Sequence, residues 1–469
     1  MALNALDRHL ALVGFMGAGK TTMAASLAAL LHWPVVDIDR EIENRYRDPI
    51  PQIFEEYGEE AFRRVEAYAV GAAVERRHRS IIDLGGGAVT FRDTHDPLDA
   101  GAFTVFLDVD ADTAWRRCEG TDRPLAQDEA TFRRLFAERQ PLYRQVADVS
   151  VASGDVDGVL LGAAGIHHEL GALDRLGELV PGDGAVALVA DTTVLGIYGP
   201  RAREALGDRL VSLHELPPGE PAKQAGVLER LWSELTLDRA GTVVALGGGA
   251  LTDVAGYAAA TYLRGVPWVA VPTTLVGQVD AGIGGKTAID IPKGKNLVGA
   301  FHWPARVVID ESLLATLPER ERRQGLAELL KTQLLAGHGL DVRGAATYKA
   351  AICLRDPHDR TVRRYLNLGH TFAHALEAAA DFDLPHGEAV ALGLLAALEL
   401  SGRDVAPVVE ALDPRPVEVD PDRAWEALLR DKKRERGEIM LVLLGDDGPV
   451  VEPRDAELVR AALERLIVR

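Results

Sequence analysis

The sequence predicts an α/β protein of about three domains, in which two units built on parallel sheets precede a mainly α-helical part. The chain has 469 residues, about three times a typical domain. Short apolar runs alternate with helical patterns over the first two thirds, as in parallel sheets covered by helices. From about residue 318 onwards, long helical patterns dominate. We place the domains at residues 1–164, 165–312 and 313–469, since small residues and Pro-Gly turns cluster near the first boundary.

Each element is expected from its own pattern. Residues 10–13 form a short apolar strand, and the Ala- and Leu-rich segment after the next Gly-rich loop is a helix that ends near residue 31. A second unit begins near residue 185 with the same order of strand, glycine cluster and Ala-rich helix. The remaining expected elements are strands at 35–38, 80–84, 103–109, 186–190 and 242–246, and helices at 59–77, 130–140, 319–336, 362–379, 387–401 and 455–466.

Composition and charge exclude several classes of protein. The chain has 52 Lys and Arg against 71 Asp and Glu, a net charge of −19, so no overall positive field attracts nucleic acid or an acidic membrane. No apolar run approaches the roughly 20 residues that span a bilayer, and no signal-peptide pattern opens the sequence. Cys118 and Cys353 cannot build a disulfide framework or a thiolate metal site. We therefore expect a cytoplasmic protein without nucleic-acid or membrane partners, whose anionic ligands bind in local basic pockets.

The segment 14–21, Gly-Phe-Met-Gly-Ala-Gly-Lys-Thr, matches the P-loop pattern between a strand and a helix. Its glycines let backbone N–H groups close round the phosphates of ATP. Lys20 is expected to reach the β- and γ-phosphate oxygens, and the Thr21 hydroxyl to ligate Mg²⁺. The expected nucleotide-binding residues are Gly17, Gly19, Lys20, Thr21 and Thr22.

Two carboxylates stand at the end of the second expected strand. Asp37 and Asp39 are two residues apart, which places both on one face of a strand. There one carboxylate can hold a metal ion and the other can accept a hydroxyl proton. We assign the ion to Asp37 and the proton to Asp39.

Further motifs follow in a characteristic order. They are Phe62-Arg63-Arg64, Gly85-Gly86-Gly87, Arg123-Pro124-Leu125 and Arg139-x-Pro141-Leu142-Tyr143. With these motifs, the P-loop and the two carboxylates, the first 165 or so residues resemble shikimate kinase. The resemblance implies that Asp39 binds the shikimate hydroxyls and that Arg63 and Arg139 pair with its carboxylate, for which arginine forks are suited. It also implies that Gly86 approaches the ring through its backbone, and that Arg123 stabilises charge on the transferred phosphoryl group.

A second group of motifs begins with Gly247-Gly248-Gly249, between a strand and an Ala-rich helix that contains Asp253. A pyrophosphate can bind to the N–H groups at such a helix start. The segments that follow are dense in Gly, Lys and hydroxyl side chains, as an anion-binding site requires. They are Pro272-Thr273-Thr274-Leu275, Asp280, Gly284-Gly285-Lys286-Thr287 and Gly294-Lys295-Asn296-Leu297-Val298-Gly299.

The helical part offers ligands for a divalent ion. Glu328, His370 and His386 supply one carboxylate and two imidazoles, which suit Zn²⁺ or a similar ion. His370 and His374 lie one helical turn apart and could both face one ion. Spacing alone does not decide between these histidines.

Residues 165–469 resemble 3-dehydroquinate synthase throughout. The resemblance implies that Glu328, His370 and His386 bind Zn²⁺ or Co²⁺, and that the chain forms a homodimer through this part. The residues implied to hold NAD⁺ are Asp191, Glu220, Lys223, Gly248, Gly249, Asp253, Thr273, Thr274 and Asp280. Those implied to surround the phosphorylated sugar acid are Arg264, Lys286, Lys295, Asn296, Lys331, Lys349, Arg363, Asn367, His374 and one of Lys432 and Lys433.

The sequence departs from the synthase pattern in one region. The segment between Glu328 and Lys349 is about 30 residues shorter than usual, and Asp356-Pro357 replaces an acidic pair. Asp290 stands where the family generally has Asn, and Lys349 is assigned through its spacing of 14 residues to Arg363. The choice of basic residue supports the assignments independently. Of nine lysines in this Arg-rich chain, eight fall on positions that the two families use.

The predicted function is therefore bifunctional. One activity is the ATP-dependent 3-phosphorylation of shikimate, and the other is the NAD- and metal-dependent cyclisation of 3-deoxy-D-arabino-heptulosonate 7-phosphate to 3-dehydroquinate with loss of phosphate. A P-loop regulatory module is the alternative for the first unit. A polyol dehydrogenase-like enzyme is the alternative for the rest, although it would not require so many Lys and Arg around its substrate.

Overall fold

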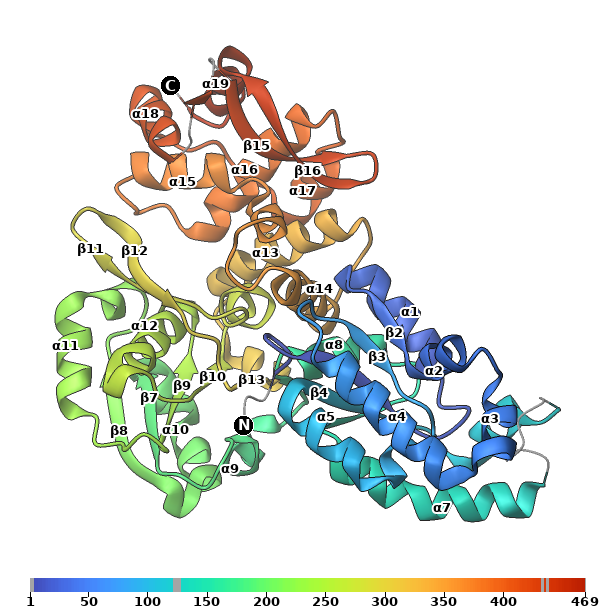
Figure 1. Ribbon diagram of the computed structural model, residues 1–469. Coiled ribbons are helices and arrows are strands. Elements are labelled where there is room, and N and C mark those ends of the chain that lie inside the picture. The colour runs from blue at the N-terminus through green and yellow to red at the C-terminus, as the bar shows by residue number, and fades with distance from the viewer. Residues whose placement is uncertain (1–3, 121–127, 432–433, 436–437, 469) are drawn as a thin grey trace. The chain divides into compact units, whose positions relative to one another are not determined.

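The structure is a computed structural model that describes residues 4–120, 128–431, 434–435 and 438–468 (Figure 1). It divides the chain into two compact units, Met1–Ile166 and His167–Arg469. The α/β architecture expected from the sequence is confirmed in both units. In the described part of the chain, no helix combines the length and the apolar character needed to cross a membrane.

The first unit is a parallel sheet with helices on both sides. Its strand order is β2-β3-β1-β4-β5, so β1 lies between β3 and β4 and the loop after β1 opens at the point where the strand order reverses. Ligands of open α/β sheets bind at such points. The strands are β1 (His9–Val13), β2 (Val35–Asp37), β3 (Ile81–Asp83), β4 (Ala102–Asp108) and β5 (Val149–Ala152). The helices are α1 (Lys20–Leu31), α2 (Ile38–Tyr46), α3 (Ile50–Tyr57), α4 (Glu59–Val74), α5 (His95–Gly101), α6 (Ala111–Cys118), α7 (Glu129–Val146) and α8 (Val156–Ala163).

The second unit begins with a six-stranded sheet of order β6-β13-β10-β9-β7-β8. Its central strands are fully buried, which explains their continuous apolar sequences. The strands are β6 (Ile166–His168), β7 (Val186–Asp191), β8 (Leu210–Leu216), β9 (Thr242–Gly247), β10 (Trp268–Pro272) and β13 (Arg306–Ile309). The helices here are α9 (Leu176–Leu179), α10 (Thr192–Leu206), α11 (Ala225–Glu234) and α12 (Gly249–Thr261), and a hairpin of β11 (Lys286–Ile291) and β12 (Gly294–Phe301) projects beyond the sheet (Figure 1).

The rest of this unit is mainly helical. Apolar side chains of α15, α16, α18 and α19 pack against a small antiparallel sheet of order β14-β15-β16. The helices are α13 (Glu319–Ala336), α14 (Val342–Arg355), α15 (His370–Ala379), α16 (His386–Leu400), α17 (Ala406–Leu412), α18 (Pro421–Asp431) and α19 (Ala456–Glu464), with a 3-10 turn η10 (Val362–Asn367) before α15. The strands are β14 (Arg434–Glu435), β15 (Glu438–Gly445) and β16 (Gly448–Asp455).

The single helix expected at 362–379 is wrong. The chain forms η10, then breaks at Gly369, and α15 begins at His370. Gly369 has φ +77°, and a Cβ there would lie 2.8 Å from the backbone N of Leu394 in α16. The close approach of the two backbones therefore requires glycine, and the break makes His370 the first residue of a helix.

The shortened segment after Glu328 forms a tight helical turn. Gly337 ends α13 in the left-handed conformation, with φ +77°. Asp341 then caps α14 by accepting the N–H of Gly344 at 2.7 Å. Five residues therefore join the two helices at this point, and Lys349 lies in the middle of α14.

Candidate active sites

The P-loop of the first unit follows β1 and leads directly into α1. Gly19 precedes α1 with φ +81°, and no side chain caps the helix, so its first N–H groups point into the loop. Gly17 also has a positive φ, and a Cβ there would lie 2.6 Å from the carbonyl oxygen of Ala114. Lys20 Nζ donates a hydrogen bond to the carbonyl oxygen of Gly14 at 2.9 Å. The loop therefore has the backbone and the cation of a phosphate-binding site.

The prediction that Asp37 and Asp39 share one face of a strand is wrong. The strand ends at Asp37, which caps α2 by accepting the N–H of Arg40 at 3.0 Å, and Asp39 lies in the first turn of that helix. Asp is a favoured cap residue, and the helix N-terminus attracts both negative charges. Burial raises the pKa of Asp39 and the charge of Asp37 adds to this, while Lys20 opposes it.

The predicted shikimate-binding residues lie together at the glycines after β3. A Cβ on Gly85 would lie 2.7 Å from Asp39 Oδ1, and one on Gly87 would lie 2.2 Å from Arg63 Nη2, so both positions need glycine. Arg139 Nη1 lies 3.4 Å from the carbonyl oxygen of Gly86. The structure therefore brings Asp39, Arg63 and Arg139 round one short loop, residues 85–87. Arg123, predicted to act on the phosphoryl group, lies outside the described residues.

Three residues of this region had no predicted role. Glu66, on α4, is buried and pairs with Arg63 at 2.6 Å, three residues before it on the same helix. Burial raises the pKa of Glu66, whereas Arg63 opposes this. Tyr143 donates a hydrogen bond to the carbonyl oxygen of Gly86 at 2.5 Å, and Asp83 at the end of β3 accepts one from Thr21 at 2.7 Å. The i,i+3 spacing of Arg63 and Glu66 was a signal in the sequence.

The glycine cluster of the second unit lies between β9 and α12. Gly248 precedes the helix and no side chain caps it, which leaves its first N–H groups for an anion. Asp253 on α12 pairs with Lys223 at 2.7 Å, and Lys223 also donates to Asn296 on the hairpin. Burial raises the pKa of Asp253 to about 6, although Lys223 opposes it. Asp290, which stands where the synthase family generally has Asn, accepts the N–H of Asn296 at 2.8 Å. This hydrogen bond stabilises the turn between β11 and β12.

Other predicted NAD⁺ residues line the ends of neighbouring strands. Asp191 caps α10 by accepting the N–H of Val194 at 2.9 Å. Thr273 follows β10, and its N–H donates to the carbonyl oxygen of Gly247 at 3.0 Å. Glu220 lies 3.9 Å from Lys295, an ion pair between the chain before α11 and the hairpin.

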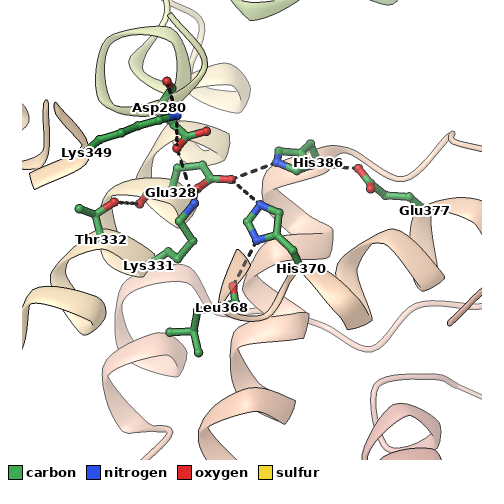
Figure 2. A network of polar contacts seen from close by, with 9 residues as sticks. All are labelled: Asp280, Glu328, Lys331, Thr332, Lys349, Leu368, His370, Glu377 and His386. Atoms are coloured by element: carbon green, nitrogen blue, oxygen red, sulfur yellow. Dashed lines mark hydrogen bonds and ion pairs between the residues drawn. The ribbon is translucent and has the colours of Figure 1, made fainter. Parts of the chain in front are cut away.

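Glu328, His370 and His386 form a cluster whose ligand atoms all lie within 4.8 Å of one another (Figure 2). Each comes from a different helix, and the two histidines open α15 and α16. Both Nε2 atoms face Glu328 Oε1, at 3.3 Å for His370 and 3.0 Å for His386. One carboxylate and two imidazole nitrogens fit a divalent ion such as Zn²⁺. His374 is not part of the cluster, and its ring packs edge-on against His370 at 5.5 Å.

Hydrogen bonds behind the histidines fix their orientation. His370 Nδ1 lies 3.2 Å from the carbonyl oxygen of Leu368, and His386 Nδ1 lies 3.0 Å from Glu377 Oε1 (Figure 2). Burial alone would lower the pKa of His386, but Glu328 and Glu377 outweigh it and raise that pKa to about 10. Burial would raise the pKa of Glu328, but Lys331 and the histidines hold it well below its usual value. Glu377 had no predicted role.

Two buried lysines share Asp280 next to this cluster. Lys349 Nζ donates to Asp280 Oδ1 at 2.7 Å, and Lys331 Nζ lies 3.7 Å from the same oxygen and 2.5 Å from Glu328 Oε2. Burial lowers the pKa of Lys349, whereas for Lys331 the carboxylates of Asp280 and Glu328 outweigh burial and raise the pKa. A concentration of positive charge next to a metal site suits a substrate with a carboxylate and a phosphate.

Two of the further predicted residues lie near Lys349, because the charges of Lys286, Lys349 and Arg363 all act on the buried Cys353. Lys286 pairs with Asp359, and a Cβ on Gly284 would lie 2.4 Å from Arg363 Nη2. Asp356 accepts backbone N–H groups of the turn before η10, including that of Arg363 at 3.1 Å, and these bonds outweigh its burial and lower its pKa to about 2. Arg264 is exposed in the turn before β10, and Asn367, the last residue of η10, is half-buried. Lys432 and Lys433 lie outside the described residues.

Fold and sites together define an enzyme with two active centres, a P-loop phosphotransferase and a synthase with a metal-binding cluster. The shikimate kinase family model matches residues 16–158, and the models of the 3-dehydroquinate synthase N-terminal and C-terminal parts match residues 213–324 and 307–434. A bifunctional shikimate kinase/3-dehydroquinate synthase from Thermotoga maritima is 31% identical over 470 residues, which cover 91% of this chain and 93% of that protein. The chain belongs to the family of bifunctional shikimate kinase/3-dehydroquinate synthases and is an enzyme with both activities.

Other relatives resemble the synthase part. The 3-dehydroquinate synthase of Bordetella pertussis is 39% identical over 348 residues, which cover 65% of this chain and 96% of that protein. A solved 2-epi-5-epi-valiolone synthase from Streptomyces hygroscopicus, with NAD⁺ and Zn²⁺ bound, is 29% identical with a TM-score of 0.56 and covers 64% of this chain and 96% of that one. A solved 2-deoxy-scyllo-inosose synthase, complexed with carbaglucose-6-phosphate, NAD⁺ and Co²⁺, has the same fold, at 24% identity and a TM-score of 0.57, over 64% of this chain and 96% of that one.

Proposed function

We propose that the kinase unit binds shikimate at the glycines after β3 and phosphorylates it with ATP. The observation that carries this is the convergence of Asp39, Arg63 and Arg139 on residues 85–87. The two guanidinium groups pair with the carboxylate of the substrate, and Asp39 accepts the proton of the attacking hydroxyl. Lys20 neutralises charge on the transferred phosphoryl group. Mg²⁺, when bound with ATP, would neutralise part of the charge on the phosphates.

We propose that Glu328, His370 and His386 hold Zn²⁺ or Co²⁺ in the synthase part, and that the start of α12 holds NAD⁺. The cluster of three ligand atoms carries the first assignment, and the uncapped helix after the glycines supports the second. When bound, NAD⁺ takes up and returns a hydride and the metal ion polarises the hydroxyl that is oxidised. The further residues proposed for NAD⁺ are Asp191, Glu220, Lys223, Gly248, Gly249, Asp253, Thr273, Thr274 and Asp280.

Lys and Arg side chains of the synthase part are proposed to bind 3-deoxy-D-arabino-heptulosonate 7-phosphate. Lys286, Lys331, Lys349 and Arg363 neutralise its carboxylate and phosphate. Two observations support this assignment: Lys331 and Lys349 share Asp280 beside Glu328, and the charges of Lys286, Lys349 and Arg363 all act on the buried Cys353. These cations would also stabilise the negative charge that the phosphate carries when it leaves. The other groups proposed round the substrate are Arg264, Lys295, Asn296, Asn367, His374 and one of Lys432 and Lys433.

One purified sample tests both proposals. Phosphate release from 3-deoxy-D-arabino-heptulosonate 7-phosphate and shikimate-dependent ADP formation are measured side by side, for the unaltered chain and for Arg139→Leu and Lys331→Met. We expect Arg139→Leu to raise the KM for shikimate and to leave phosphate release intact. Lys331→Met should impair phosphate release and leave shikimate-dependent ADP formation intact. Loss of both activities in a folded single variant would contradict the assignment of separate sites.

We also propose that the chain is a cytoplasmic homodimer that associates through the synthase part, with domain boundaries after residues 164 and 312. The end of the six-stranded sheet at β13 and the start of the helical part at α13 support the second boundary. Sedimentation of the full chain and of residues 165–469 tests the association. The proposal predicts that both sediment as dimers, and a monomeric synthase part would contradict it.

A further inference from the structure

We propose that Asp83 holds the magnesium ion of the kinase site together with Thr21, a role that the sequence assigned to Asp37. The proposal rests on the proposed kinase function and adds a metal-binding residue to it. It follows from where β3 ends, from the hydrogen bond between the two side chains, and from the bonds that Asp37 already makes.

The last residue of β3 lies beside the P-loop. Strand β3 pairs in parallel with β1 and with β2, so Asp83 is in register with Leu12 in one neighbour and with Asp37 in the other. The P-loop leaves β1 at the same edge of the sheet. In P-loop enzymes the magnesium ion is held by the loop Ser or Thr and by a carboxylate at the end of a strand. Asp83 occupies such a strand end, and only 6% of it is exposed.

The side chains of Thr21 and Asp83 are joined by a hydrogen bond. Thr21 Oγ1 donates to Asp83 Oδ2 at 2.7 Å. A hydroxyl has one proton and two lone pairs, so donation to Asp83 leaves both lone pairs for a metal ion. Burial raises the pKa of Asp83, while Lys20 and the Thr21 hydrogen bond oppose this. A buried carboxylate beside a hydroxyl matches the few oxygen ligands that a protein gives to phosphate-bound Mg²⁺.

The other two carboxylates of this edge are engaged elsewhere. Asp37 Oδ1 accepts the N–H of Arg40 at 3.0 Å as the cap of α2. Asp39 Oδ1 lies next to Gly85, on the side of the predicted shikimate-binding arginines. Of the three, Asp83 is the one bonded to the predicted metal ligand Thr21.

The hydrogen bond between Thr21 and Asp83 could serve only to stabilise the fold. Replacing Asp83 with Asn distinguishes this structural role from metal binding. Asp83→Asn keeps an oxygen that accepts the Thr21 proton but removes the negative charge. Asp37→Asn is the matched control, since Asn caps helices as well as Asp does. A purely structural Asp83 would tolerate the amide, whereas a metal-binding Asp83 would not.

The test uses the full-length chain with Mn²⁺ as a probe, and free Mn²⁺ is measured by electron paramagnetic resonance in the presence of ADP. We expect Asp83→Asn to weaken Mn²⁺ binding to the ADP complex by roughly 10–100-fold. The affinity for ADP without metal, and phosphate release by the synthase part, should remain unchanged. The Asp37→Asn variant should bind Mn²⁺ as the unaltered chain does.

Two results would overturn the proposal. One is unaltered Mn²⁺ affinity in Asp83→Asn, and the other is a larger loss in Asp37→Asn than in Asp83→Asn. If Asp83→Asn does not fold, Asp83→Ser is measured in its place, because serine keeps a neutral acceptor for Thr21. Failure of the kinase assignment itself would look different, since the unaltered chain would then bind neither ADP nor Mn²⁺ with ADP.

Discussion

Binding of Zn²⁺ to the metal-free enzyme should release about one proton from His386 at about pH 8. The hydrogen bonds and charges of Glu328 and Glu377 outweigh burial and raise the pKa of His386 to about 10. At about pH 8 this ring is therefore protonated in about 99% of molecules, whereas a histidine with an ordinary pKa would be protonated in about 3%. A metal ion binds the neutral imidazole, so the proton must leave.

The same reasoning gives the pH dependence. The raised pKa means that the proton on His386 stabilises the metal-free fold below about pH 6.5, and that this contribution is lost as the pH rises through about 10. Metal affinity should therefore increase about tenfold per pH unit up to that limit. The His386 side chain is 38% exposed, so solvent screening lowers its pKa and with it the pH up to which metal affinity increases. The number of protons released at about pH 8 stays near one as long as the pKa of His386 remains above about 9.

Calorimetric titration of the metal-free chain with Zn²⁺, in two buffers of different ionisation enthalpy, measures the number of protons released. Glu377→Gln is the control, because it keeps the shape of Glu377 and removes one charge that raises the pKa of His386. This variant should release fewer protons and bind Zn²⁺ more weakly. Release of less than about 0.3 protons by the unaltered chain at about pH 8 would refute the reasoning.

Three further predictions concern the separation of roles. Lys20→Arg should abolish shikimate-dependent ADP formation and preserve phosphate elimination, since a guanidinium group does not fit the P-loop as a point charge; retained kinase turnover would contradict this. The two activities should survive separation of the chain after residue 164, and a folded half that is inactive until the other is added would show that the sites are shared. His370→Ala should lose its metal after dialysis, whereas His374→Ala should keep its metal and bind substrate poorly; the opposite pattern of metal content would reverse the two roles.

Elements with a strong local pattern were predictable. The helix expected at 319–336 is α13 (Glu319–Ala336), and the P-loop lies between β1 and α1 as its sequence indicates. The sheet in the last third was missed, because residues 439–444 are a continuous apolar run, which periodicity alone does not distinguish from a buried helix segment. The surrounding helical patterns concealed a signal that spans only a few residues.

The break at Gly369 was not predictable from local sequence. Residues 362–379 read as one helix, and the break is required by the backbone of α16, which is more than 20 residues away in the chain. The boundary at Asp37 was misread for a different reason. Asp is depleted in strands and favoured as a helix cap, and the paired acidic residues mark the start of α2.

The site residues also divide into those that the local sequence indicates and those that depend on tertiary contacts. Lys20, His370 and His386 are each the first residue of a helix. Gly19 and Pro385 mark two of these boundaries in the sequence, whereas Gly369 marks the third only through its contact with α16. Glu66 and Glu377 lie inside helices and act through a neighbouring side chain. The i,i+3 spacing of Arg63 and Glu66 indicates a pair but not its burial, and no local pattern distinguishes Glu377 from a surface acid. Motifs therefore reveal the groups at element boundaries, and tertiary contacts are needed for the groups that orient them.

Gly369 allows this link between backbone and site to be tested. Gly369→Ala must place a Cβ 2.8 Å from the backbone N of Leu394 in a residue with φ +77°, so we expect a loss of roughly 2–5 kcal/mol of stability and a displaced His370. Gly337→Ala is a matched control, because Gly337 has the same φ of +77° and no atom within 4 Å of the added Cβ. It should cost roughly 1–2 kcal/mol and leave metal binding unchanged. Thermal unfolding and Zn²⁺ content are measured for both variants. Equal Zn²⁺ content in the two variants would mean that the position of His370 does not depend on the contact between α15 and α16.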